Sequence, residues 1–385
     1  MAIRVLTISK PYVARVQREK FKYLARDDRF EIGLIAPTSW GSQKFEPDPP
    51  EAKSNYWLKV LPICFTGKNH FHFYKGLADA IAEFKPDIIN AEEEHYSIVT
   101  WQIFREAKKL GVKRMFFAWQ NIDKHYPPPF CWIEQYIFRN ADMAMTGSKN
   151  AIDVLRRKGY KGKAEVCPQV GIDIDAFRLQ GDAESEKRNL KQRIGFAPDD
   201  FLILSAGRVV EEKGVQVTIN AMKQLRSDKA KLVILGTGPH LDVLKGLVNS
   251  DSRLQQVVRF AGAVPSYEMP NYTRAADVMC LSSLTRPHWK EQGPTRVITE
   301  SMAAQTVAVV SDSTELPIVV QDAGVVAREG DATNLAQKLN QLIEEPKLRS
   351  QLRQKGLDRV RNHYSAQVIA AKNAEIFAAV MQSKN

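Results

Sequence analysis

The stretch FLILSAGRVVEEKG, residues 201–214, decides the fold of the second half of the chain. Its mostly apolar run, 201–206, is typical of a buried β-strand, and a helical pattern follows position 214. The glycines at 207 and 214 allow a sharp turn and a close approach of the backbone to a ligand. Arg208 and Lys213 place two cations at this strand end, where they suit a diphosphate beside a helix N-terminus. A structural ion pair with Glu211 or Glu212 is the alternative interpretation.

Two further strand ends in the same half carry residues suited to a ligand. LVILGTGP, 232–239, ends a strand at Gly236 and Gly238, although a Gly-x-Gly without the full dinucleotide fingerprint is a weak signal. In HWKEQGPTRVITESMAAQ, 288–305, a Gly-Pro turn precedes a helix whose first turn offers free N–H groups. Glu300 lies on that helix and suits the hydroxyls of a ribose. For Glu291 or Glu300 taken singly, a solvated helix face is the alternative.

The alternation of short apolar runs with helical stretches extends over the whole chain of 385 residues. It predicts βαβ units with mostly parallel sheets in two α/β domains, with a ligand cleft between them. In the first half we expect strands at 3–9, 31–37, 57–65, 87–91, 114–120, 143–148 and 164–169, and helices at 12–25, 73–84, 97–110, 130–140 and 149–158. The polar stretch 173–200 reads as a linker with one short helix. The first domain is therefore 1–172 and the second 201–364.

Composition and charge exclude several classes of protein. Hydrophobic residues make up 44% and charged residues 26%, which excludes a mainly disordered chain. Four cysteines without metal-ligand spacing predict free thiols in a reducing compartment, and no apolar run reaches the roughly 18 residues of a membrane span. Of the net charge of +11, most lies in residues 1–172, with 27 Lys and Arg against 19 Asp and Glu. This half suits an anionic partner, unless the charge is only a solvated surface.

Taken together, these pieces resemble a known family. GRVVEEKG, ILGTGP, FAGAVPSYEMPNY, AADVMCLSS and RVITESMAAQ, in this order within residues 200–328, are similar to the donor half of retaining GT-B glycosyltransferases of the family 4 type, the glycosyl transferases group 1. In the first half, VARVQREKFKYLA, AEEEHYSIVTWQ, WQNIDKHYPPPF and CPQVGIDIDAF resemble a subgroup without the usual Gly-Gly loop after the first strand. The resemblance implies two Rossmann-like domains facing each other across a cleft, with the final helix, about 365–385, packed back on the first.

The resemblance also implies roles for the donor-side residues. Arg208 and Lys213 would hold the donor diphosphate and stabilise it as a leaving group, so that no metal and no cofactor is needed. Glu300 would hold the ribose. The other donor-binding positions would be Gly207, Gly238, Gln292, Gly293, Pro294 and Thr295. In the family, seven residues separate the two glutamates of a paired motif; counted back from Glu300, that spacing falls on Gln292, so either Glu291 or Gln292 contacts the sugar, and we favour Glu291.

On the acceptor side the residues are less specific. His125 follows the strand that ends in Trp119-Gln120-Asn121 and suits proton transfer near pH 7, unless it is only a loop histidine. We expect Glu94, in the run Glu92–Glu94 after a strand, to bind the acceptor together with Asn121. Asp173-Ile174-Asp175 and the pair His70 and His72 resemble metal ligands, but their contexts argue against metal binding. The basic stretch 13–26 rests either on a membrane surface or, by the alternative, on the sheet.

The sequence as a whole predicts a metal-independent, retaining transferase that moves a sugar from a UDP- or GDP-linked donor to a glycan or lipid-linked acceptor. We expect it in the cytoplasm, either free or peripheral on the inner face of the membrane, with no nucleic-acid partner. A catalytically inactive scaffold of the same fold that binds a nucleotide-sugar is the alternative.

Overall fold

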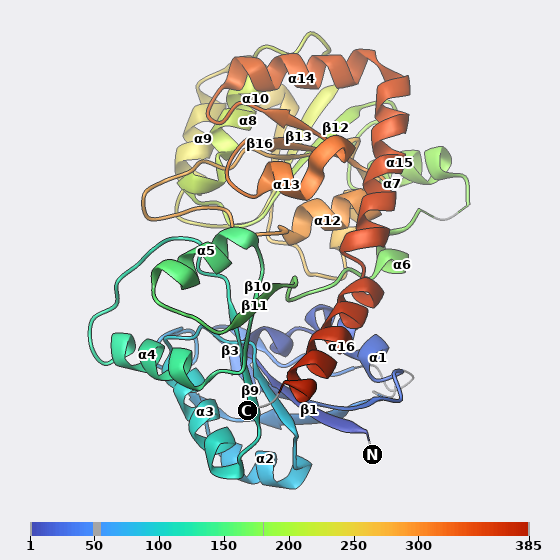
Figure 1. Ribbon diagram of the computed structural model, residues 1–385. Helices are drawn as coiled ribbons and strands as arrows, with labels where there is room; N and C mark the ends of the chain where they lie inside the picture. The colour runs from blue at the N-terminus through green and yellow to red at the C-terminus, as the bar shows by residue number, and fades with distance from the viewer. Residues whose placement is uncertain (1, 49–54, 180, 384–385) are drawn as a thin grey trace. The chain divides into compact units, whose positions relative to one another are not determined.

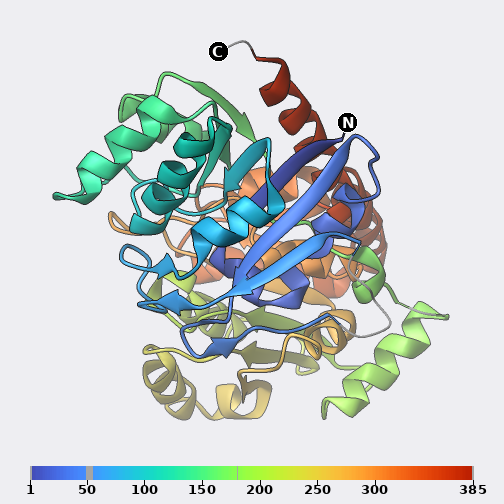
Figure 2. The ribbon, with the colours of Figure 1, turned by 90° about the horizontal axis from the view of Figure 1, so that it is seen from below.

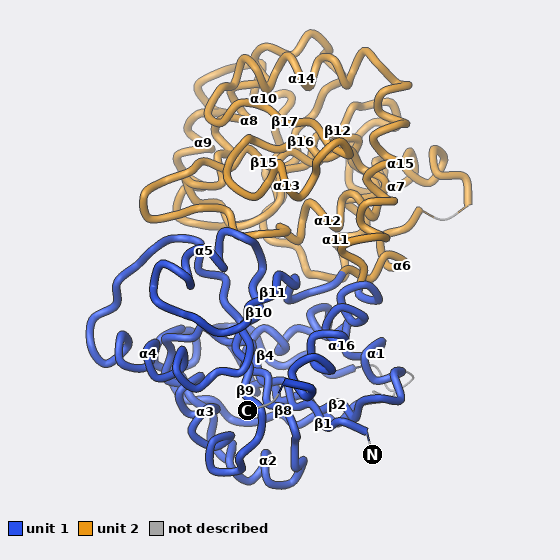
Figure 3. Tube along the Cα trace, viewed as in Figure 1, with its two compact units in different colours: residues 1–171, 366–385 blue, residues 172–365 orange. Residues whose placement is uncertain are grey.

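The computed structural model of the chain describes residues 2–48, 55–179 and 181–383. The chain divides into two compact units, drawn in Figure 3: unit 1 holds residues 1–171 and 366–385, and unit 2 holds residues 172–365. Each unit contains one parallel sheet covered by helices on both faces (Figure 1). The predicted α/β fold class is confirmed. Residue 180, within the predicted linker, and residues 384–385, at the end of the predicted final helix, lie outside the described residues.

Unit 1 is built on a seven-stranded parallel sheet in the order β11-β10-β9-β8-β1-β2-β5. Its strands are β1 (Ile3–Ile8), β2 (Phe30–Pro37), β5 (Trp57–Leu61), β8 (Ile88–Ala91), β9 (Lys113–Ala118), β10 (Met143–Thr146) and β11 (Lys163–Val166). Two small hairpins pair β3 (Ser39–Trp40) with β4 (Gln43–Lys44) and β6 (Ile63–Cys64) with β7 (Phe73–Tyr74). The helices are α1 (Glu19–Leu24), α2 (Leu77–Phe84), α3 (Ile98–Leu110), α4 (Phe130–Asn140), α5 (Lys149–Arg157) and α16 (Ala366–Gln382).

The basic stretch 13–26 differs from the expected continuous helix. It contains the end of one 3₁₀ turn (Lys10–Val13), a second (Arg15–Gln17) and the short α1. Val13, Phe21 and Leu24 are buried against the sheet. The packing alternative therefore holds for these side chains, which are not available to a membrane surface.

Helix α16 supplies one side of the unit 1 core, although it comes last in the chain. Its residues Ile369, Ala374 and Phe377 pack with buried residues of β1 and β2, and α16 lies along α1 (Figure 2). The Phe377 ring meets the Phe30 ring edge-on, with 6.2 Å between centroids. Long-range apolar packing of this kind adds both buried area and ring–ring contact energy.

Unit 2 is built on a six-stranded parallel sheet in the order β14-β13-β12-β15-β16-β17. Its strands are β12 (Phe201–Ala206), β13 (Ala230–Leu235), β14 (Val258–Gly262), β15 (Val278–Leu281), β16 (Val307–Ser311) and β17 (Gly324–Ala327). Its helices are α6 (Ile174–Phe177), α7 (Ala183–Arg193), α8 (Val215–Met222), α9 (Leu241–Asn249), α10 (Ser252–Val257), α11 (Met269–Ala275), α12 (Arg296–Ala303), α13 (Leu316–Val320), α14 (Ala332–Glu344) and α15 (Pro346–His363). Alternate side chains of β12 enter the apolar clusters on opposite faces of the sheet, which explains its almost continuous hydrophobic sequence.

The segment 173–200 is more than the linker with one short helix that the sequence predicts. It contains both α6 and α7, and it belongs to unit 2. The sequence of α7 is mostly polar and therefore resembles a surface helix. Its Lys187 and Lys191 are nevertheless buried and contact Asp277, just before β15. Sequence reasoning missed these contacts because a buried lysine has no pattern of its own.

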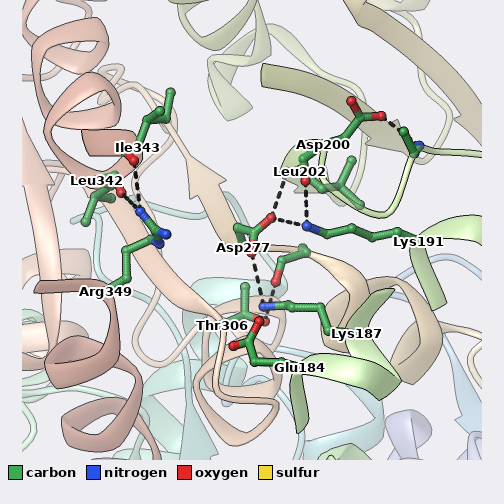
Figure 4. A network of polar contacts seen from close by, with 12 residues as sticks. Glu184, Lys187, Lys191, Asp200, Leu202, Asp277, Thr306, Leu342, Ile343 and Arg349 are labelled. Atoms are coloured by element: carbon green, nitrogen blue, oxygen red, sulfur yellow. Dashed lines mark hydrogen bonds and ion pairs between the residues drawn. The ribbon is translucent and has the colours of Figure 1, made fainter. Parts of the chain in front are cut away.

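A buried charge network joins α7 to the amino-terminal edge of the unit 2 sheet (Figure 4). The Asp277 carboxylate lies 2.6 Å from Lys191 Nζ and 3.5 Å from Lys187 Nζ, and it accepts a bond of 2.9 Å from the Leu202 N–H. Arg353 of α15 lies 3.2 Å from it. Burial lowers the pKa of Lys187 to about 8, although Asp277 opposes the shift. Asp277 is thus shared by three cations, of which Arg353 also pairs with Glu184 at 2.9 Å.

We expect Asp277→Asn to lower the free energy of unfolding by about 3 kcal/mol, because removing one partner leaves buried charges uncompensated. Urea unfolding at neutral pH measures this loss. Asp322→Asn, which breaks an exposed pair with Lys355, is the matched control and should cost about 0.5 kcal/mol or less. An Asp277 variant as stable as the native chain would contradict a structural role for the network.

Candidate functional site

The strand order of unit 2 places a switch point at β12, because the chain leaves this strand towards β13 and β14 first and later returns to β15 on its other side. Ligands of open α/β sheets bind outside the carboxyl ends of the strands at such a point. The loops that follow β12, β13 and β14 are joined there by backbone hydrogen bonds: Gly207 N–H donates to Leu235, and Gly236 N–H donates to Gly262. Only glycine fits at 236, since a Cβ there would lie 1.8 Å from the Gly207 oxygen.

A pocket of about 310 Å³ opens at these loops. Its lining comes from the ends of β12 and β13, the loop after β14, and α12: Ala206, Gly207, Leu235, Gly236, Ala263, Val264, Ser266, Met269, Arg296, Val297 and Glu300. Glu300 is the carboxylate of this pocket and pairs with Arg296 one turn earlier on the helix. Burial raises the pKa of Glu300, and Arg296 limits that rise. The pocket therefore combines apolar walls with one hydrogen-bond acceptor.

Lys213, which follows β12, and Glu291, which precedes α12, form a close ion pair. Lys213 Nζ lies 2.8 and 2.9 Å from the two Glu291 carboxylate oxygens, and the Ser283 hydroxyl donates to Glu291 at 2.7 Å. Lys213 also lies 5.3 Å from the centroid of the Trp289 ring. Lys213 forms no ion pair with Glu211 or Glu212 within the described chain. Hydrogen bonds from the backbone and from His288 lower the pKa of Glu212, and the charge of Arg208 adds to this shift. Those glutamates instead contact Arg286 and His288.

The remaining donor-side residues surround this pair unevenly. Arg208 is exposed and forms no hydrogen bond or ion pair with the rest of the described chain. Gln292 is exposed, whereas Glu291 is buried. Gly293 turns the loop with φ of 60° before Pro294, and the buried Thr295 hydroxyl at the start of α12 has no partner among the described residues. Gly238 does not line the pocket; it packs on Val209, where a Cβ would lie 2.3 Å from a carbonyl oxygen.

In unit 1 the corresponding switch point lies between β1 and β8, and three consecutive glutamates follow β8. Glu92 is buried and accepts bonds from Lys20 at 2.6 Å, from Asn90 at 2.9 Å and from Tyr12. Glu93 pairs with Lys10 and lies 3.5 Å from His72 Nε2. Burial would raise the pKa of Glu93, but Lys10 and His72 lower it to about 2. These two carboxylates are therefore compensated inside the protein.

Glu94 differs from its neighbours. Burial raises its pKa to about 7, with Glu93 adding to the shift and Lys10 and Lys158 opposing it. One carboxylate oxygen, Oε2, is buried without a hydrogen-bond partner in the described chain. An unpartnered acceptor of this kind is costly unless a ligand or water bonds to it. Of the three glutamates, Glu94 is thus the one suited to a bound group.

A second buried pair near this edge escaped sequence reasoning. His95 Nε2 lies 2.9 Å from Glu134, and Lys158 Nζ lies 2.5 Å from the same carboxylate. Lys158 also donates to the Lys124 carbonyl at 2.8 Å and so anchors the loop that carries His125. His125 itself is exposed, and Asn121 is buried. No spacing rule connects residues 95, 134 and 158, so only their position in the fold brings them together.

The sequence's metal-like patterns have structural explanations. The Asp173 side chain caps α6 by accepting from the Asp175 N–H at 3.1 Å. His72 Nδ1 lies 3.1 Å from the Asn69 carbonyl, and His70 packs among the rings of Tyr96, Tyr126 and Phe130. Within residues 2–48, 55–179 and 181–383, no group of three or more His, Cys, Asp or Glu side chains is arranged to hold a metal ion. Over the same ranges, no helix has the length and apolar character to cross a membrane.

Comparison with known proteins gives the class. Residues 186–359 match the glycosyl transferases group 1 family. The chain is 31% identical over 182 residues to an amylovoran biosynthesis glycosyltransferase of Erwinia amylovora, covering 46% of this chain and 43% of that protein. It is 32% identical over 154 residues to a GDP-mannose-dependent alpha-(1-6)-phosphatidylinositol monomannoside mannosyltransferase of Mycobacterium tuberculosis, covering 39% of each. The chain spans about half the length of the first curated relatives it matches.

The structural likeness extends over both units. HepE of Anabaena, solved in complex with UDP, superposes with a TM-score of 0.73 at 17% identity, covering 98% of this chain and all of that one. This likeness gives the chain the GT-B fold. Residues 186–359 thus match the family that the resemblance of the motifs in this half of the chain indicates.

The titration of Glu94 predicts a pH-dependent stability. The folded chain keeps this proton up to about pH 7, whereas the unfolded chain releases it near the ordinary value of 4.5. Between these values the folded state binds more protons, so the contribution of Glu94 to stability falls as pH rises.

We expect Glu94→Gln to gain about 1 kcal/mol or more of stability relative to the native chain when pH is raised from 5 to 8. Urea unfolding at both pH values measures the change, with the exposed Glu83→Gln as control. A pH-independent difference would show that Glu94 titrates normally.

Proposed function

We propose that the protein transfers a sugar from a nucleotide-sugar to a glycan or lipid-linked acceptor, with retention of configuration and without a metal. The observation that carries the proposal is the arrangement at the unit 2 switch point. There, a pocket with one carboxylate, Glu300, lies beside the ion pair of Lys213 and Glu291 and the exposed cation Arg208. A neutral pocket for a nucleoside next to paired cations suits a nucleoside diphosphate with an attached sugar.

In this proposal each charged residue has one task. Arg208 and Lys213 hold the diphosphate and stabilise the negative charge that grows on it as the bond between the sugar C1 and the phosphate oxygen breaks. The acceptor oxygen forms its bond to C1 on the same face, and its proton passes to the departing phosphate. Glu300 accepts hydrogen bonds from the ribose. The Gly293 and Thr295 N–H groups face the donor, next to Pro294, which has none.

Glu291 is the better candidate for the sugar-binding carboxylate. It is buried and held by Lys213 and Ser283, whereas Gln292 is exposed. Before the donor binds, Glu291 compensates the Lys213 charge; with a donor present, the diphosphate takes over Lys213 and frees Glu291 to accept from a sugar hydroxyl. The loop carries one residue more than the family spacing, and this geometry supports Glu291 despite the shift.

For the acceptor we propose unit 1. The unpartnered Glu94 oxygen and the buried Asn121 supply hydrogen-bonding groups. His125, four residues after Asn121, is exposed. The name of the Mycobacterium tuberculosis relative gives GDP-mannose as the donor and phosphatidylinositol monomannoside as the acceptor. HepE was solved with UDP. Both UDP- and GDP-linked donors therefore enter the test. A lipid-linked acceptor fits a cytoplasmic enzyme working at the inner face of the membrane.

Calorimetric titration with UDP, GDP and dTDP tests the diphosphate site. We expect one nucleotide to bind the native chain and the Arg208→Ala/Lys213→Ala variant to bind it about 100-fold more weakly, because two charge-assisted contacts are lost. The exposed pair Arg226→Ala/Lys245→Ala serves as the matched control and should leave affinity unchanged. If no nucleotide binds a folded sample, the donor site is not where we propose it.

Measuring the rate of donor consumption decides whether Glu291 or Gln292 contacts the sugar. It also decides whether the protein is an active enzyme or an inactive scaffold. We expect Glu291→Gln to reduce donor consumption about 100-fold while nucleotide affinity is kept, because the contact forms only with the sugar. Gln292→Ala should remain within a few-fold of the native rate. The opposite pattern would assign the sugar contact to Gln292. Tight nucleotide binding with no turnover of any donor would instead favour the inactive scaffold.

A further inference from the structure

An apolar groove on unit 1 is lined by residues of α3 and α4. These two helices lie side by side (Figure 1). The groove has a volume of about 470 Å³ and is lined by Ile98, Trp101, Pro129, Trp132, Ile133 and Tyr136. The spacing of three and four residues puts these side chains on facing stripes of the two helices. Trp132 is 68% exposed, although the large apolar ring of a tryptophan is usually mostly buried. The α3–α4 groove therefore has the composition of a docking surface.

Cations surround the aromatic rings of the α3–α4 groove. The Arg105 guanidinium lies 5.1 Å from the Trp101 ring centroid, and Lys108 Nζ lies 5.8 Å from the Tyr136 centroid. Lys109 and Arg139 are exposed on the same helices. The acidic residues there are compensated: Glu106 pairs with Lys109 and Arg105, and Glu134 pairs with Lys158 in the interior. The rim is thus positively charged.

We propose that the α3–α4 groove docks unit 1 on an anionic phospholipid bilayer, with Trp132 entering the headgroup region and the Arg105 and Lys108 side chains on the lipid phosphates. Tryptophan and tyrosine rings prefer the boundary between hydrocarbon and water. Basic side chains beside them add attraction to anionic lipids. This charge pattern is the reason to favour a bilayer over an apolar protein partner. The proposal goes beyond sugar transfer, because the bilayer is not the substrate.

Vesicle flotation of the full chain, without donor or acceptor, tests this docking. We expect the native chain to float with vesicles of phosphatidylcholine and phosphatidylglycerol and to stay behind with phosphatidylcholine alone. Trp132→Ser should weaken binding about tenfold, since an exposed ring is lost without damage to the core. Arg105→Gln/Lys108→Gln should weaken it by a similar factor at low salt and by less at high salt.

Val243→Ser and Lys245→Gln on α9 of unit 2 remove an exposed apolar residue and an exposed cation elsewhere, and both should float like the native chain. Binding that is equal for the native chain and Trp132→Ser would overturn the proposal, as would a native chain that floats with neither vesicle. A native chain that ignores vesicles but loses a dimer in sedimentation when Trp132 is replaced would make the groove a contact between two copies and would equally overturn it. Because no nucleotide is present, these outcomes are independent of the proposed transfer.

Discussion

The close contact of Gly236 with the Gly207 carbonyl is the constraint on which the geometry of the unit 2 pocket depends. It lets the loops after β12 and β13 touch through their backbones, so the pocket with Glu300 opens at a rigid edge. Gly214 makes the same kind of approach to Ser282, where a Cβ would lie 1.8 Å from the carbonyl oxygen. The Gly214 contact adjoins Lys213 in sequence, and Ser283, next to Ser282, donates to Glu291. The charged residues are therefore positioned by backbone packing, and not by their own attraction alone.

Burial of charge distinguishes the two units. At the carboxyl edge of the unit 1 sheet, Glu92 and Glu93 have lysine partners and Glu94 keeps an unpartnered oxygen. At the amino-terminal edge of the unit 2 sheet, Asp277 holds three cations. Such groups are costly to desolvate, and their mutual arrangement must be accurate to repay that cost. The first cluster lies at the switch point of the unit 1 sheet, while the second lies at the edge of the unit 2 sheet opposite to its pocket.

Sequence reasoning recovered the sheets because buried parallel strands leave continuous apolar runs, as in 201–204 and 307–310. It also predicted a ligand site near Gly207 and Glu300, and both residues line the unit 2 pocket. It could not decide between Glu291 and Gln292, because a turn at Gly293 determines which of the two side chains is buried. It missed the pair of His95 with Glu134 and the lysines of α7, because contacts between residues far apart in sequence leave no local pattern.

The last helix has a consequence for the order in which the chain acquires its structure. Helix α16 completes the apolar core that packs on one face of β1 and β2. The first 171 residues therefore have an incomplete core until the ribosome has released position 382. Unit 2 has all its strands and helices by residue 365. Domains usually fold in the order of their synthesis; here the unit that is begun first is finished last. During translation, the apolar side chains of Phe30 and its neighbours stay exposed to solvent until Phe377 has been synthesised and packs on them. Exposed apolar surface of this kind is what chaperones bind.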